Sequence, residues 1–252
     1  GKVPQDARVV LKPSQCAFLR ETEGANLVVQ QSPIRCYTDE EYRKKGVPVV
    51  ESVEDCDILI GVKEVPIEQL LADKTYFFFS HTIKEQPYNR ELLRTVLAKN
   101  IRLIDYEALV DRNGKRLIAF GFFAGMVGAH NALLTYGRRT GEFSLIRMKD
   151  VFDYGQVKKT YSNIDWPPIK IVLTGKGRVG TGAAKVLDDM GIRRVTPEQY
   201  LTIDYSEPVY TQIDYDKYVR PRPGSGRNLS DFYEHPEDFE SVFAPYAKVS
   251  DV

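Results

Sequence analysis

Short apolar runs alternate with amphipathic stretches through the first half of the chain. Residues 57–62, 76–80 and 101–105 each have the length and the β-branched or aromatic content of a buried strand, and residues 25–30 form another strand-like run. Strands that alternate with helices over short connections indicate βαβ units. The pattern therefore predicts an α/β fold with a parallel sheet.

Helices are expected between these strands. A short helix starts after Thr38, which can cap its acidic first turn. Residues 66–71 predict another short helix, and residues 89–99 predict a longer one with leucines on it.

Small residues recur at near-helical spacing over residues 120–136. They predict a long helix whose small face packs closely on a neighbour and which links two domains. After the rigid Trp166-Pro167-Pro168, a new strand is expected at 169–173. We therefore expect a substrate domain over residues 1–135 and a dinucleotide-binding domain over residues 136–252.

The next turn carries a glycine motif. Gly175, Gly177 and Gly180 spell G-x-G-x-x-G between the expected strand and a helix that runs to Met190, and Arg178 and Val179 fill its variable positions. The first glycine permits a tight turn, the second lets a pyrophosphate approach, and the third lets the helix pack on the strand. The motif predicts binding of NAD or NADP at the start of this helix.

The choice between NAD and NADP is left open by the next strand, expected at 192–195. Glu198 is the first acidic residue after it, but Pro197 displaces it from the position that binds a ribose. Arg193 or Arg194 could favour a 2′-phosphate instead. We take NAD as the preferred expectation.

Periodicity is lost after residue 200, and residues 208–236 are rich in tyrosine, proline, glycine and charge. They predict a long irregular loop. Few residues then remain to complete a doubly wound nucleotide domain, so we expect an incomplete Rossmann sheet.

Composition narrows the function classes. The 252 residues carry 35 basic and 35 acidic side chains, which argues against a nucleic-acid or membrane partner. The sequence has no apolar run long enough to span a bilayer, and we expect no signal peptide. Cys16, Cys36 and Cys56 lack metal-ligand spacing, so we expect free thiols, no metal site and a cytoplasmic location.

Two titratable side chains end neighbouring strands. Lys63 follows the run at 57–62, and His81 follows the aromatic run at 76–80. Open α/β sheets bind ligands at the carboxyl ends of their strands. Lys63 and His81 are therefore candidates for an acid–base pair.

Residues 61–64, 79–84 and 101–107 resemble a known enzyme family, and residues 119–128 and the turn at 177–180 continue the match. The sequence resembles the lysine–ketoglutarate reductase half of aminoadipic semialdehyde synthases and the lysine-forming saccharopine dehydrogenases. Both belong to the alanine dehydrogenase and transhydrogenase superfamily. The resemblance implies two Rossmann-like domains with parallel sheets that flank a cleft and are joined by a long helix. It also implies a chain truncated at both ends.

Site roles follow from the resemblance residue by residue. Lys63 and His81 match the acid–base groups of the family. Arg8 and Arg116 match substrate-binding arginines, and Lys2 lies near a second basic position. Further substrate-site positions are matched by Glu64, Lys84 and Glu107.

The implied reaction is hydride transfer between NAD or NADP and the CH–NH group of saccharopine, with a small amino-acid substrate as the partner. One alternative is a dehydrogenase of a smaller amino acid, similar to alanine dehydrogenase. Another is a nucleotide-binding module without catalysis. Nothing in the sequence predicts the oligomeric state.

Overall fold

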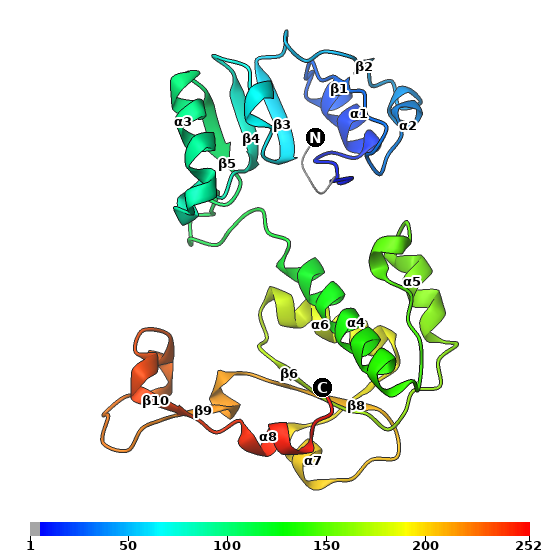
Figure 1. The fold of residues 1–252 in the computed structure, drawn as a ribbon, viewed down its shortest axis with the longest axis vertical. Helices are drawn as coiled ribbons and strands as arrows, with labels where there is room; N and C mark the ends of the chain where they lie inside the picture. The colour runs from blue at the N-terminus through cyan, green and yellow to red at the C-terminus, as the bar shows by residue number, and fades with distance from the viewer. Residues whose placement is uncertain (1–5) are drawn as a thin grey trace. The chain divides into compact units, whose positions relative to one another are not determined.

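The computed structural model describes residues 6–252. These residues divide into two compact units, with the boundary between Ala119 and Phe120. Each unit contains a parallel sheet with helices (Figure 1). The α/β class with parallel strands expected from the sequence is therefore confirmed. The division falls before the long helix α4 (Gly121–Thr140), whereas we expected it after residue 135.

The first unit is built around a three-stranded parallel sheet in the order β3-β4-β5. Its strands are β3 (Ile58–Lys63), β4 (Thr75–Phe79) and β5 (Arg102–Asp105). Helix α3 (Arg90–Ala98) packs on one face of this sheet, where Leu92 and Val96 join Tyr76 and Phe78 in a buried core. Three 3₁₀ turns, Ile67–Gln69, Thr82–Lys84 and Pro87–Asn89, lie in its connections.

A smaller group of helices and strands precedes this sheet in the first unit. It contains α1 (Pro13–Thr22), β1 (Val29–Gln30), α2 (Asp39–Arg43) and β2 (Val49–Val50), with β1 and β2 paired in parallel. Cys16, Tyr42 and Val47 form its core, and the Tyr42 hydroxyl donates to the carbonyl of Leu11 at 2.7 Å. Thr38 caps α2 as expected, because its side chain accepts from the backbone N–H of Glu41. The strand expected over 25–30 is limited to its last two residues.

The second unit holds a parallel sheet in the order β6-β8-β7. Its elements up to the last of these strands are α4, a 3₁₀ turn Met148–Asp150, α5 (Tyr154–Tyr161), β6 (Lys170–Thr174), α6 (Arg178–Asp189), β7 (Arg193–Arg194), α7 (Pro197–Thr202) and β8 (Val209–Ile213). The main core lies between α4, α5, α6 and the sheet. Across residues 6–252, no helix combines the length and the apolar character that crossing a membrane requires.

The prediction of an irregular loop over residues 208–236 is wrong at its start. Residues Val209–Ile213 form the central strand of the sheet, and all of them are buried. The hydrophobicity pattern missed this strand because Thr211 and Gln212 are polar. In the structure, both side chains have hydrogen-bond partners within the protein. Thr211 donates to the Val195 carbonyl at 3.1 Å, and Gln212 donates to the Gly175 carbonyl at 2.8 Å. A buried polar side chain with such partners is compatible with a core strand.

The rest of the chain returns to the edge of the sheet. The antiparallel pair β9 (Val219–Pro221) and β10 (Phe239–Ser241) precedes α8 (Ala244–Val249), with 3₁₀ turns at Tyr215–Lys217, Leu229–Tyr233 and Pro236–Asp238. The backbone of Val252 then accepts from the N–H of Val172 in β6 at 2.9 Å. The final residues therefore run beside β6.

Helices α4 and α6 approach each other closely through glycines, as the small face of α4 predicted. A Cβ on Gly125 would lie 1.9 Å from the backbone oxygen of Val179, and a Cβ on Gly182 would lie 1.9 Å from that of Phe122. A Cβ on Gly128, one turn further along α4, would meet no heavy atom within 4 Å. Only glycine allows the two backbones to pack at this distance.

Gly125→Ala is expected to lower the free energy of unfolding by about 1–3 kcal/mol or more, because the helices must separate to admit the methyl group. Gly128→Ala is the matched control in the same helix. It should be neutral or stabilising by up to about 1 kcal/mol, since alanine has the higher helix propensity. Thermal and denaturant unfolding measure both, and equal effects of the two substitutions would contradict the close α4–α6 contact.

Candidate active site

Lys63 and His81 meet at the carboxyl ends of two neighbouring parallel strands. Lys63 ends β3 and is paired in register with Phe79 of β4, two residues before His81. The register shifts between Ile60 and Lys63, an irregularity of the kind that redirects a side chain near a functional site. Lys63 Nζ lies 2.8 Å from His81 Nε2. The structure therefore brings the two expected acid–base groups into direct contact.

Glu107 lies at the centre of this cluster. Its side chain is 5% exposed, and its Oε2 lies 2.9 Å from His81 Nδ1. Its Oε1 lies 3.0 Å from Arg116 Nη2 and 3.3 Å from Lys84 Nζ. One buried carboxylate therefore joins three of the residues that the resemblance placed in the site.

Burial and the neighbouring hydrogen-bond donors act on the pKa of Glu107 in opposite directions. Burial of the carboxylate raises the pKa, but hydrogen bonds from His81, Lys84 and Arg116 together lower it more, so it lies below its usual value of 4.5. Glu107 is therefore ionised at neutral pH and accepts hydrogen bonds from its neighbours.

The contacts of His81 define its tautomer. An ionised Glu107 can only accept, so Nδ1 carries the proton that points to Oε2. Nε2 is then free to accept from the Lys63 ammonium at 2.8 Å. Lys84 Nζ also lies 3.2 Å from Nδ1, but it cannot donate to a protonated nitrogen, so we assign its interaction to Glu107. The result is a hydrogen-bonded chain from Glu107 through His81 to Lys63.

The expected carboxylate holder Arg8 lies near this chain but is bound to an acidic neighbour. Its Nε and Nη2 donate to the two oxygens of Asp6 at 2.9 and 2.6 Å. The hydrogen bond from Arg8 lowers the pKa of Asp6, and the charge of Lys63 lowers it further. The Arg8–Asp6 pair therefore lies within electrostatic range of Lys63. Asp6 was not foreseen from the sequence.

Glu64 and Lys2 are the remaining expected substrate-site residues. Glu64 follows Lys63 directly after β3 and is partly buried. Lys2 lies outside the described residues.

In the second unit, the glycine turn joins β6 to α6. Gly175 has φ +86°, which favours glycine, and a Cβ on Gly177 would meet no heavy atom within 4 Å. A Cβ on Gly180 would lie 2.1 Å from the Gly175 carbonyl oxygen. Each of the three positions thus favours glycine for a different local reason. The open space beside Gly177 leaves room for a pyrophosphate. Arg178 and Val179 start α6 and are exposed.

Gln212 supports this turn from the neighbouring strand and was missed in the sequence. Its amide donates to the Gly175 carbonyl at 2.8 Å and accepts from Arg194 Nη2 at 2.9 Å. Arg194 ends β7, where the ribose partner of a dinucleotide is expected. The residues present therefore fit a dinucleotide, and Arg194 is a candidate for contacting its ribose.

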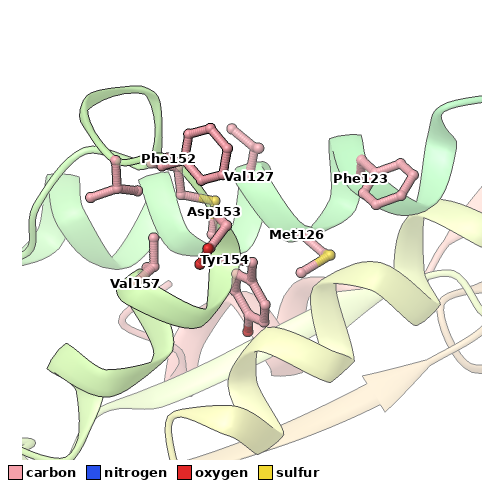
Figure 2. A pocket seen from close by; sticks show the side chains of 9 residues that line it. Phe123, Met126, Val127, Phe152, Asp153, Tyr154 and Val157 are labelled. Carbon is pink, nitrogen blue, oxygen red and sulfur yellow. The ribbon is translucent and has the colours of Figure 1, made fainter. Parts of the chain in front are cut away.

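An apolar hollow on the second unit lies between α4 and α5, lined by Phe123, Met126, Val127, Asp153 and Tyr154 among others (Figure 2). Its volume is about 180 Å³, below the roughly 300 Å³ at which small-molecule sites usually begin. Its one carboxylate, Asp153, already caps α5 by accepting from the backbone N–H of Gln156. The hollow therefore lacks the polar groups of a substrate site.

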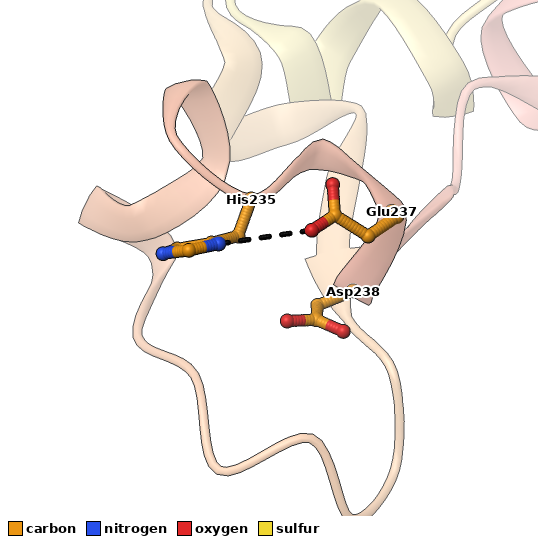
Figure 3. Close-up of side chains that lie close together, drawn as sticks. All are labelled: His235, Glu237 and Asp238. Carbon is orange, nitrogen blue, oxygen red and sulfur yellow. Dashed lines mark ion pairs between the residues drawn. The ribbon is translucent and has the colours of Figure 1, made fainter.

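One group of potential metal ligands occurs in the described part of the chain. His235, Glu237 and Asp238 offer ligand atoms within 4.8 Å of one another (Figure 3). His235 Nδ1 lies 3.7 Å from Glu237, while Asp238 is bonded to Arg227 at 2.8 Å. Because the group is surface-accessible and Asp238 already has a cationic partner, we assign no metal to it.

Comparison with known proteins assigns the chain to a family. Residues 2–127 match the model described as the alanine dehydrogenase/PNT, N-terminal domain. The chain belongs to the alanine dehydrogenase/PNT family. The matched residues include Lys63, His81, Lys84, Glu107 and Arg116, so the whole cluster lies within the part that matches the family.

Relatives extend the similarity beyond this domain. The chain is 30% identical to the mitochondrial alpha-aminoadipic semialdehyde synthase of Mus musculus over 88% of its own length and 27% of that protein. It is 30% identical to the saccharopine dehydrogenase [NAD(+), L-lysine-forming] of Schizosaccharomyces pombe over 75% of its length and 56% of that protein. The resemblance to these enzymes is confirmed, and the chain spans about a quarter and about half of their respective lengths.

A solved L-alanine dehydrogenase shares the fold. The match has a TM-score of 0.51 at 20% identity and covers 84% of this chain and 58% of the other. At this identity it supports the α/β fold and carries nothing about substrate.

Glu107→Gln is expected to lower the free energy of unfolding at neutral pH by about 1–3 kcal/mol, because it removes the charged acceptor of three hydrogen bonds. A carboxylate whose pKa is lowered in the folded state contributes stability that is fully present above its ordinary pKa and lost as the pH falls through the lowered value. The difference between variant and wild type should therefore shrink below about pH 4.

Denaturant unfolding across this pH range measures the effect. Glu91→Gln is the matched control, since Glu91 pairs with Arg94 at 2.8 Å on the exposed side of α3 and should change stability little at any pH. A constant difference between Glu107→Gln and wild type from neutral to acidic pH would contradict the charged role of Glu107.

Proposed function

We propose that the chain is part of a nicotinamide-dependent oxidoreductase that acts on the CH–NH group of saccharopine, with lysine and 2-oxoglutarate on the other side of the reaction. The observation that carries this proposal is the linked Lys63–His81–Glu107 group at adjoining strand ends. The similarity to alpha-aminoadipic semialdehyde synthases and lysine-forming saccharopine dehydrogenases supports the substrate.

The chemistry needs one hydride transfer and several proton transfers. A bound nicotinamide supplies or accepts the hydride at the carbon of the secondary amine. Oxidation leaves an imine, to which water adds, and the resulting carbinolamine breaks its C–N bond to release the amine of lysine and the carbonyl of 2-oxoglutarate. Each of these later steps transfers a proton to or from a nitrogen or oxygen atom of the substrate, and a positioned acid–base group can catalyse such a transfer.

In this proposal Lys63 exchanges protons with the substrate, and His81 relays them. Its Nε2 faces Lys63, and its Nδ1 proton is held by Glu107. An imidazole between a lysine and a buried carboxylate can take up a proton at one nitrogen without losing its orientation. Glu107 therefore acts as the group that orients His81.

Cationic side chains around this group suit a substrate with several carboxylates. Arg116 and Lys84 approach Glu107 with side chains that are 50% and 46% exposed, so each can also contact a ligand. Guanidinium groups bind carboxylates in a bidentate fashion. Arg8 already shows this geometry with Asp6, and a substrate carboxylate could take the place of Asp6.

A second candidate is a dehydrogenase of a smaller amino acid, favoured by the match to the alanine dehydrogenase/PNT domain. The number of substrate carboxylates separates the two candidates. We propose NAD as the cofactor because the S. pombe relative is named as NAD(+)-dependent, while the position of Arg194 makes NADP the comparison to run.

The full-length protein should oxidise NADH with lysine plus 2-oxoglutarate and not with pyruvate plus ammonia, and it should oxidise NADPH more slowly than NADH. His81→Gln should reduce turnover by about 100-fold or more, since it removes the relay. It should leave dinucleotide binding unchanged. His235→Gln is the control. Absence of turnover with lysine and 2-oxoglutarate, or an active His81→Gln variant, would overturn the proposal.

Gly177→Ala tests the nucleotide site without disturbing the fold. A methyl group there meets no atom of the protein, so thermal stability should be unchanged. It would occupy the space through which a pyrophosphate approaches, so the dissociation constant for NADH should rise about tenfold or more. Fluorescence titration measures this, with Gly128→Ala as the matched control. Unchanged affinity in Gly177→Ala would place the dinucleotide elsewhere.

A further inference from the structure

The carboxylate of Asp105 links the strand ends that carry His81 and Glu107. Asp105 ends β5 and is paired in register with Phe78 of β4. The main-chain ladder ends as the N–H of Tyr106 donates to the Phe78 carbonyl at 3.2 Å. Two residues after Phe78, Ser80 Oγ donates to Asp105 Oδ2 at 2.5 Å. Asp105 Oδ1 accepts from the backbone N–H of Glu107 at 2.8 Å.

Ser80 connects this link to the backbone of His81. Its side chain is fully buried, and its one hydroxyl proton is used on Asp105. Its oxygen must therefore accept from Thr82, whose hydroxyl lies at 2.8 Å and whose backbone N–H lies at 3.2 Å. The hydrogen bonds between Ser80 and Thr82 thus join the two residues that flank His81, and the Ser80 hydroxyl uses its full hydrogen-bonding capacity.

His81 is the residue that needs this support. Its φ of 57° and ψ of 12° are left-handed, a conformation that is unfavourable for a non-glycine residue. The side chain of Asn89 also donates to its carbonyl at 3.3 Å. A strained residue persists only where its surroundings over-determine it, and such residues cluster at functional sites. The left-handed turn is what directs the imidazole toward Lys63 and Glu107.

We propose that Asp105 and Ser80 are positioning residues, which hold His81 in the left-handed conformation that places its imidazole between Lys63 and Glu107. The effect of Asp105 and Ser80 on turnover rests on the proposed function, whereas their effect on the orientation of His81 does not. The two are therefore tested with separate measurements.

The orientation is measured by nitrogen NMR on protein labelled with ¹⁵N-histidine. The chain has three histidines, and His81→Gln identifies the signals of His81. In the wild type at neutral pH, Nδ1 should appear protonated and Nε2 as an acceptor. In Ser80→Ala and Asp105→Ala, the two nitrogens should average toward the values of the more exposed His235. Unchanged His81 signals in folded Ser80→Ala and Asp105→Ala would overturn the proposal.

Asp105→Asn separates geometry from folding. Asparagine keeps an acceptor for the Glu107 N–H and can donate to Ser80 Oγ, so the His81 signals should return to those of the wild type. Signals as disturbed in Asp105→Asn as in Asp105→Ala would overturn the positioning role. Ser230→Ala, at an exposed hydroxyl, is the control for serine substitution.

Turnover with lysine plus 2-oxoglutarate is the second measurement. A misplacement of about 1 Å costs about 100-fold in rate, so Ser80→Ala and Asp105→Ala should lower kcat to this extent with little change in KM. Asp105→Asn should recover most of it. If the wild type shows no turnover, the proposed function fails while the NMR result still decides the positioning role.

Discussion

A carboxylate taken out of water must replace its lost hydration with donors, and the candidate site depends on how Glu107 meets this requirement. Its two oxygens receive His81 on one side and Lys84 with Arg116 on the other. His81 and Lys84 come from the turn after β4, and Arg116 comes from the segment after β5, so the carboxylate is the point at which the two segments converge. Without it, two cationic side chains and a histidine would share the same space with no shared anion.

This convergence requires the register of β3, β4 and β5. Lys63 aligns with Phe79, and Asp105 aligns with Phe78, so all the site residues emerge at the same edge of the sheet. Slipping a strand by one residue would turn its side chains to the opposite face. The aromatic residues of β4 prevent such a slip, because Tyr76 and Phe78 are buried against α3. The packing of the core of the first unit therefore also fixes the strand register on which the geometry of the candidate site depends.

The sequence was sufficient where function and periodicity coincide. Aromatic and β-branched runs located β3, β4 and β5, and the polar residues that end them, Lys63 and His81, are in contact in the structure. It was insufficient where a side chain is satisfied by a partner distant in the chain. The central strand β8 was missed because Gln212 looks like a surface residue until Gly175, at the end of another strand, supplies its acceptor. Asp6 was missed although its partner Arg8 is two residues away, since only the folded chain places the Arg8–Asp6 pair near Lys63.

The two units solve one structural problem in the same way. A parallel ladder ends before the turn that carries function, so the turn needs support from a side chain. In the first unit, Asp105 of β5 reaches beyond β4 to fix the turn at His81. In the second, Gln212 of β8 reaches the carbonyl of Gly175 just after β6. Both supporting residues are polar, come from the adjoining strand and act one step past the last paired residues. Rigid elements hold a site more precisely than loops do, and these side chains extend that rigidity into the turns.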